Sequence, residues 1–118
     1  MAKTREVLGE LVKVDGVNAA VIVARDGFVI DGVSNRGNLD TETVGAVISA
    51  GTGSSEVMGR ELNVGAMTQG MIEFTGGLIM MNLVGLDTIL AVVADPKANL
   101  GYVRLQIKKR IPEIENVL

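Results

Sequence analysis

Residues 17–33, VNAAVIVARDGFVIDGV, carry the pattern that decides how the chain begins to fold. Residues 17–25 are rich in β-branched side chains and have the length of a strand, and residues 28–33 repeat that character. Asp26-Gly27 stands between the two runs, and this pair favours a two-residue type I′ turn. We therefore predict a β-hairpin of two antiparallel strands.

Three more strands are predicted in the second half of the chain. Residues 78–84 and 88–94 are nearly all apolar, which is typical of central strands covered on both faces. Residues 68–74 alternate imperfectly and include Gln69 and Glu73, so one face of this segment is partly polar. That character predicts a strand at the edge of a sheet.

Helices are predicted before, between and after these groups of strands. A short helix over residues 4–13 is capped by Thr4. A last helix is capped by Asp95, has Pro96 at its start and is stopped or kinked by Pro112. No internal repeat, linker or low-complexity segment interrupts the chain, so residues 1–118 are predicted to form a single domain. Hairpin-connected strands with helices between them indicate an antiparallel α+β architecture.

The helix predicted over residues 40–63, capped by Asp40, has two apolar faces. The face that we expect to pack on the sheet consists of Val44, Ile48, Gly51, Ser55, Met58 and Leu62. The opposite face is small and apolar where a monomer's surface helix would carry charges, and it consists of Ala46, Ala50, Gly53 and Val57. Small residues permit the close approach of a second backbone. Packing on both faces would offset the cost of the four glycines in this helix, about 0.5–1 kcal/mol each.

The composition excludes several classes of function. The chain has 118 residues, of which 47% are hydrophobic and 21% charged, as in a globular protein with a substantial core. It has no Cys and no His, which removes thiol nucleophiles, ordinary zinc sites and histidine-based hydrolytic triads. A formal net charge of −3 argues against a nucleic-acid partner. We expect a non-catalytic protein without a cofactor or metal.

The remaining motifs have structural explanations. Residues 51–55, GTGSS, are not followed by the Gly-Lys-Ser/Thr of a phosphate-binding loop, and they fall in the middle of a predicted helix. The acidic residues show no spacing that would pair two of them in an apolar pocket. Arg25, Arg36 and Arg60 are candidates for an arginine finger by residue type alone. Of the methionines, Met80 and Met81 are expected in the core.

The N-terminus shows no signal peptide, and every apolar stretch has the length of a strand. These observations predict a cytoplasmic protein without membrane insertion.

Several segments resemble the roadblock/dynein light chain family, in particular its MglB-like branch in bacteria and archaea. The resemblance covers nearly the whole chain and is carried by VDGV at residues 14–17, VARDGFVI at residues 23–30, and LAVVAD at residues 90–95 leading to NLG at residues 99–101. It implies a five-stranded antiparallel sheet with the long helix on one face and the two terminal helices on the other. None of these segments is catalytic.

The resemblance also implies a function in protein–protein interaction. Relatives form homodimers in which the long helix and the third strand meet their symmetry mates. Here that dimer interface would comprise Ala46, Ala50, Gly53, Val57, Gln69, Met71 and Glu73. Relatives bind small Ras-like GTPases as activators or scaffolds, which implies an MglA-like partner. Two alternatives remain open at this point: a purely structural dimerisation subunit, and a small-ligand sensor.

Overall fold

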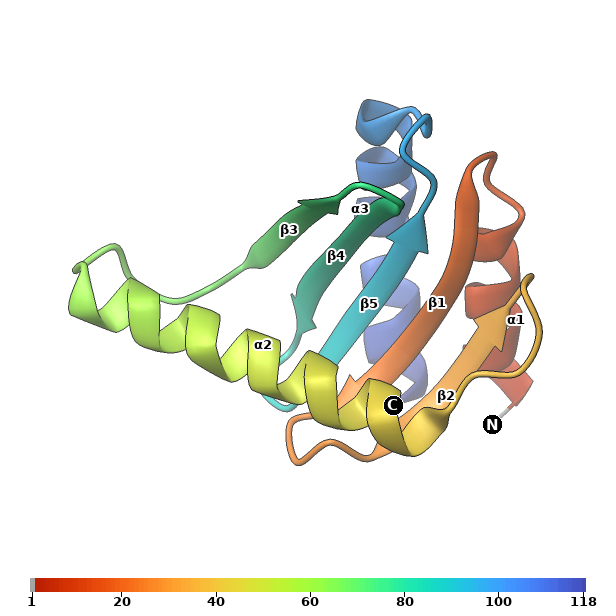
Figure 1. The fold of residues 1–118 in the computed structure, drawn as a ribbon. Helices are drawn as coiled ribbons and strands as arrows, with labels where there is room; N and C mark the ends of the chain where they lie inside the picture. Colours follow the sequence, from red (N-terminus) through yellow and green to blue (C-terminus); the bar gives the residue numbers. More distant parts are fainter. Residues whose placement is uncertain (1) are drawn as a thin grey trace.

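A computed structural model describes residues 2–118 and contains one sheet and three helices. In chain order the elements are α1 (Ala2–Val12), β1 (Val17–Ala24), β2 (Val29–Ser34), α2 (Thr41–Glu61), β3 (Gln69–Phe74), β4 (Gly77–Val84), β5 (Thr88–Ala94) and α3 (Leu100–Val117). All five strands pair antiparallel in the order β2-β1-β5-β4-β3 (Figure 1). The predicted order of elements and the predicted α+β class are confirmed.

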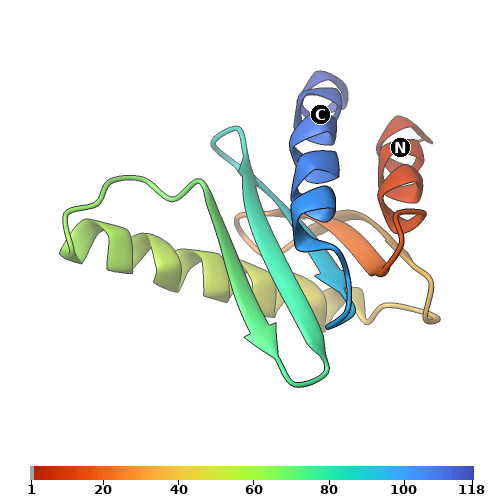
Figure 2. The ribbon, with the colours of Figure 1, turned by 90° about the horizontal axis from the view of Figure 1, so that it is seen from above.

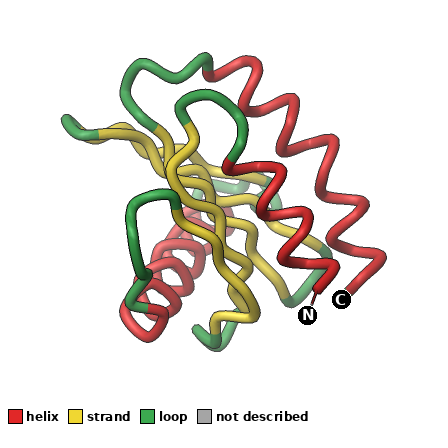
Figure 3. The backbone as a smooth tube through the Cα atoms, turned by 90° about the vertical axis from the view of Figure 1, so that its right-hand side faces the viewer, coloured by secondary structure: helices red, strands yellow, loops and turns green. Residues whose placement is uncertain are grey.

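The sheet separates two layers of helices. α2 packs against β1, β2 and β5 on one face, whereas α1 and α3 contact each other and cover the opposite face. Figure 3 shows the strands between the pair of terminal helices on one side and α2 on the other. This arrangement is the one that the family resemblance implied.

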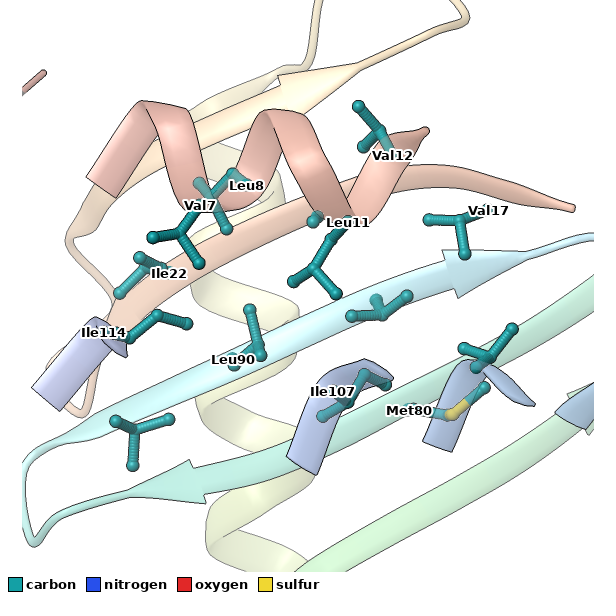
Figure 4. Close-up of a cluster of buried hydrophobic side chains, with 14 residues drawn as sticks. Val7, Leu8, Leu11, Val12, Val17, Ile22, Met80, Leu90, Ile107 and Ile114 are labelled. Atoms are coloured by element: carbon teal, nitrogen blue, oxygen red, sulfur yellow. The ribbon is translucent and has the colours of Figure 1, made fainter. Parts of the chain in front are cut away.

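The larger core lies between the sheet and the two terminal helices (Figure 4). Its fully buried members are aliphatic, and they include Leu8, Leu90, Ile107 and Ile114. Met80 and Met81 are both buried but lie on opposite faces of β4, one in each of the two cores. The burial predicted for both methionines is confirmed.

The turn between β1 and β2 differs from the predicted type I′ turn. The amide of Gly27 donates to the carbonyl of Ala24 at 2.9 Å, and the amide of Ala24 donates to the carbonyl of Phe28 at 2.8 Å. Gly27 has φ +96, while Asp26 has a negative φ, which a type I′ turn does not allow. The hairpin therefore closes through a three-residue turn with a glycine bulge. The left-handed Gly27 brings this turn against α2.

Both ends of α3 differ from the prediction. Asn99, not Asp95, caps the helix and accepts a hydrogen bond from the amide of Tyr102 at 3.1 Å. The carboxylate of Asp95 instead accepts hydrogen bonds from the side chains of Asn18, at 2.9 Å, and Arg36, at 2.8 Å. Pro112 lies inside α3, which continues to Val117, so of the two predicted outcomes, a stop or a kink, the stop was wrong. The fully buried Ile114 fixes the turn beyond the proline to the core.

Thr4 lies within α1 and does not cap it. Its buried hydroxyl donates to the carboxylate of Asp31 on β2 at 3.0 Å, and Arg5 binds the same carboxylate at 2.9 Å. Asp31 thus joins α1 to the outer strand of the hairpin. The prediction failed because a threonine near a helix start serves equally well as a cap or as a buried donor. By contrast, the predicted cap of α2 is confirmed, with Asp40 accepting from the amide of Thr43 at 3.2 Å.

Candidate interaction surface

The second half of α2 extends beyond the part of the sheet that the helix covers (Figures 1 and 2). Gly45, Ile48 and Thr52 are its buried residues, and all three lie before its last two turns. Met58 and Leu62, which we predicted to pack on the sheet, are 57% and 72% exposed. The apolar pattern of the helix was recognised correctly, but its C-terminal part has no sheet to cover.

The opposite face of α2 is exposed in this chain, as predicted. Ala46, Ala50, Gly53 and Val57 all lie on the surface. A methyl group added at Gly53 would meet no other atom within 4 Å. This surface is therefore smooth and has room for a second backbone at close range.

β3 is an edge strand, as its sequence predicted. Its outer side has no neighbouring strand among residues 2–118, so its outward amides and carbonyls are available for pairing with another chain. Such a row of free backbone groups beside exposed apolar side chains favours the addition of a strand. Met71, Ile72 and Phe74 are large apolar side chains on this strand, and all three are exposed.

The predicted interface residues on β3 point to the side of the sheet that carries α3. Met71 lies opposite Met80, which belongs to the core under α1 and α3, and directly paired residues share a face. Gln69 and Glu73 alternate with Met71 on that face. Ile72 and Phe74, which the sequence interpretation missed, lie instead on the α2 side. The predicted set is thus divided between the two faces of the sheet.

An open apolar hollow lies between the second half of α2 and β3. Its volume is about 410 Å³, and its lining includes Met58, Leu62, Val64, Met67, Ile72 and Met81. The hollow reaches β3, and the exposed face of α2 with Ala46, Ala50, Gly53 and Val57 lies on the other side of the same helix. We call this region the α2–β3 surface.

Arg25, in the turn between β1 and β2, is held in place against α2. Its guanidinium makes two hydrogen bonds of 2.5 Å with Glu56 on α2 and one of 2.6 Å with the carbonyl of Leu86 in the β4–β5 turn. The hydroxyl of Ser49 donates to the carbonyl of Arg25. Hydrogen bonding with Glu56 raises the pKa of Arg25 above its usual value, and the same interaction lowers the pKa of Glu56. This network fixes both turns to the helix.

The other two arginine candidates differ in their surroundings. Arg36 pairs with Asp95 at 2.8 Å. Arg60, on the last turn of α2, is exposed and makes no ion pair with any residue from 2 to 118. Arg25 and Arg60 both act on the carboxylate of Glu56 and lower its pKa, Arg25 by hydrogen bonding and Arg60 by its charge, whereas Arg36 pairs elsewhere.

The rest of the described chain offers little for chemistry. Residues 51–55 lie in the middle of α2, which agrees with their rejection as a phosphate loop. Within residues 2–118, no three acidic side chains gather where they would hold a metal ion. None of the described helices is long and apolar enough to cross a membrane.

Comparison with known proteins places this architecture in a family. The model of the Roadblock/LC7 domain matches residues 3–94. The chain belongs to the Roadblock/LC7 family. The uncharacterized protein MJ0714 of Methanocaldococcus jannaschii is 38% identical over 109 residues, which cover 92% of this chain and 91% of that protein.

Solved structures confirm the fold. Myxococcus xanthus MglB superposes with a TM-score of 0.92 at 22% identity, covering 99% of this chain and 95% of that chain. A structure described as MglB with tetrameric arrangement gives 0.89 at 18% identity, covering 98% of this chain and 88% of that chain. The roadblock fold predicted from the sequence, with its MglB-like arrangement of helices, is therefore confirmed.

Proposed function

We propose that this Roadblock/LC7 protein is a non-catalytic homodimer that binds a small Ras-like GTPase in the cytoplasm and regulates or scaffolds it. The observation that carries the proposal is the α2–β3 surface. It combines an apolar helix face, an open apolar hollow and an unpaired strand edge. Exposed apolar side chains gathered around a hollow are typical of an interaction site.

A second copy of the chain is the occupant that fits this surface best. A two-fold axis perpendicular to the sheet would pair the two β3 edges antiparallel and extend the sheet from one protomer into the next. The same axis would place both α2 helices on one side. There, the small residues Ala50 and Gly53 would allow close packing of the two helices. Met58, Leu62 and Ile72 would then be covered by the partner. The tetrameric arrangement named for an MglB structure supports self-association in proteins of this fold.

The GTPase part of the proposal is supported by family membership and by the likeness to MglB. Ras-like GTPases are partners of the family that this chain resembles. Arg25, the arginine with the most contacts, is held by Glu56 and Leu86 and is not free to enter another protein's active site. We therefore assign no catalytic residue, and we propose that the dimer acts by positioning the GTPase's own groups. A GTPase works where GTP is supplied, and this supports a cytoplasmic location.

The dimer is tested by size-exclusion chromatography with light scattering on three proteins: the unaltered chain, Gly53→Lys and Gly9→Lys. Gly53 and Gly9 both lie in helices and have no atom within 4 Å of an added Cβ. Gly53→Lys places a charge where two backbones would meet, so we expect it to elute as a monomer. Gly9→Lys makes the same change on α1, on the other side of the sheet, and should leave the dimer intact. A Gly53→Lys dimer would show that α2 does not form the interface.

The partner is tested with a purified MglA-like GTPase. We expect a complex when the GTPase carries a non-hydrolysable GTP analogue, and a changed rate of single-turnover GTP hydrolysis. Binding without any change in rate would instead favour a structural subunit. Absence of both binding and rate change, with the dimer intact, would overturn the GTPase proposal and leave the dimer proposal standing.

A further inference from the structure

The segment that contains α3 concentrates positive charge. Residues 96–112 hold five cations and no carboxylate, and the cations are Lys97, Arg104, Lys108, Lys109 and Arg110. Arg110 pairs with Glu113 at 3.1 Å. The other four make no ion pair with any part of the chain that the structure describes. Unpaired cations gathered on one element leave a local field for an external anion.

Three of these cations share the outer face of α3 with two exposed apolar side chains. Arg104 and Lys108 stand one turn apart, and Leu105 and Lys109 follow the same spacing beside them. Tyr102 and Leu105 are 51% and 59% exposed. The opposite side of the helix, with Val103 and Ile107, is buried. We call Tyr102, Arg104, Leu105, Lys108 and Lys109 the α3 face.

Charge is also unevenly distributed along the whole sequence, with an excess of cations in the terminal segments and an excess of carboxylates between them. The terminal segments, residues 1–16 and 95–118, carry eight cations and six carboxylates. Residues 17–94, which include the sheet and α2, carry three cations and eight carboxylates. α1 and α3 together cover one face of the sheet (Figure 2), so the cations of α3 lie on the opposite side of the sheet from Glu42, Glu56 and Glu61 of α2. An extended anionic surface would orient it with α3 inward.

We infer that this protein adsorbs to anionic phospholipid membranes through the α3 face. Lysine is depleted in the cores of protein–protein interfaces, which disfavours a protein as the occupant. Tyrosine and leucine flanked by lysine and arginine are the side chains that settle at the boundary between lipid and water. α3 is a helix on the outside of the molecule, so it presents these side chains to a flat surface without rearrangement (Figure 2).

The proposed homodimer would strengthen adsorption, although the α3 face is complete in one chain. A two-fold axis perpendicular to the sheet places both copies of α3 on the side away from α2. Two α3 faces would then meet one membrane together, and the second contact would be intramolecular. For this step alone, the inference rests on the proposed function.

Vesicle co-sedimentation of the full chain tests the proposal. The vesicles contain equal parts of phosphatidylglycerol and phosphatidylcholine, or phosphatidylcholine alone. We expect binding to the anionic vesicles at low salt, loss of binding when screening is strong, and no binding to neutral vesicles. Each cation near an anionic membrane strengthens binding about fivefold. The variant Lys108→Gln/Lys109→Gln should therefore bind about 25-fold more weakly per protomer.

The matched control is Lys3→Gln/Lys13→Gln, which removes the same charge from two exposed positions, one in α1 and one directly after it. If the α3 face is the contact, this control should bind at least fivefold more tightly than Lys108→Gln/Lys109→Gln. Equal losses in the two variants would overturn the proposal, since net charge alone would then explain binding. Binding to a short DNA duplex but not to anionic vesicles would overturn it in favour of a nucleic acid. Light scattering and the hydrolysis assay on Lys108→Gln/Lys109→Gln report separately on the dimer and on the GTPase.

Discussion

The contact between α2 and the β1–β2 turn makes a prediction about Gly45. An ideal Cβ built at this position would overlap the carbonyl oxygen of Gly27 and would lie 3.0 Å from its carbonyl carbon. A methyl group of Val29 would be 3.2 Å away. The obstructing atoms of Gly27 belong to the backbone of a turn that is fixed by Arg25 and Ser49. Gly45→Ala must therefore move either the helix or the hairpin.

The expected loss of stability follows from two opposing effects. Replacing a glycine inside a helix by alanine normally stabilises a protein by about 1 kcal/mol, because alanine restricts the unfolded chain. Forcing an extra methyl group into a packed contact costs about 1–3 kcal/mol. The overlap with backbone atoms places Gly45 near the upper end of that range. We expect a net destabilisation of about 2 kcal/mol, which corresponds to a fall in Tm of about 8 °C for a domain of this size.

Thermal unfolding at a fixed protein concentration measures this effect, since the Tm of an oligomer depends on concentration. The control is Gly9→Ala in α1, where an added Cβ meets no atom within 4 Å. That substitution should raise the free energy of unfolding by about 0.5–1 kcal/mol. If Gly45→Ala also raised the Tm, the close packing of the helix on the turn would be refuted, and the glycine would need another explanation.

Two further predictions concern the Arg25–Glu56 pair and the cap of α3. The pKa of Glu56 is lower in the folded protein than its usual 4.5. The Arg25–Glu56 pair therefore stabilises the fold fully above pH 4.5. Its contribution is lost as the pH falls through the pKa that Glu56 has in the folded protein. Urea unfolding between pH 7 and pH 3 should therefore show Arg25→Ala losing less stability on acidification than the unaltered chain, by less than about 1 kcal/mol. An equal or larger acid loss in the variant would contradict this. In the same assay at pH 7, Asn99→Ala should cost about 1 kcal/mol as a lost helix cap. An unchanged free energy of unfolding in Asn99→Ala would show that Asn99 does not stabilise α3 as its cap.

Local periodicity was sufficient to predict most elements of this fold. The apolar runs at residues 78–84 and 88–94 became central strands because burial on both faces demands continuous apolar sequence. The partly polar run that includes Gln69 became the edge strand for the opposite reason. Asp40 was identifiable as a cap because its carboxylate is followed at the right distance by helix-forming sequence.

The local apolar periodicity of the sequence could not predict that Met58 and Leu62 are exposed. A helix of 21 residues is about 32 Å long, whereas five strands side by side span about 19 Å from the first to the last. A helix that starts over β2 and crosses the sheet must therefore extend past it. The apolar stripe continues into that overhang, which is sensible only if something other than the sheet covers it. Helix length compared with sheet width was the signal that would have separated the core-facing part of the stripe from the interface.

The face of each β3 side chain was equally undetermined from the sequence. Alternation assigns Ile72 and Phe74 to one face and Met71 to the other, but it does not say which face α2 covers. That depends on pairing with β4, where Met80 and Met81 divide between the two cores. The same pairing places the apolar Ile72 and Phe74 on the α2 side of β3 and the polar Gln69 and Glu73 on the α3 side.

This separation determines how the two proposed surfaces relate. Edge-to-edge pairing through β3 uses backbone groups that lie in the plane of the sheet, and it buries apolar side chains on the α2 side. It leaves Leu105, Lys108 and Lys109 exposed on the outer face of α3, while Arg104 lies beside Gln69 and Met71 of β3. A two-fold dimer therefore doubles the cationic face without covering it. The same geometry places the carboxylates of α2, Glu42, Glu56 and Glu61, away from any anionic surface, where repulsion is smallest. Dimerisation and adsorption are thus compatible by construction, and a partner that docks on the joined α2 helices would remain accessible while the dimer is bound to a membrane.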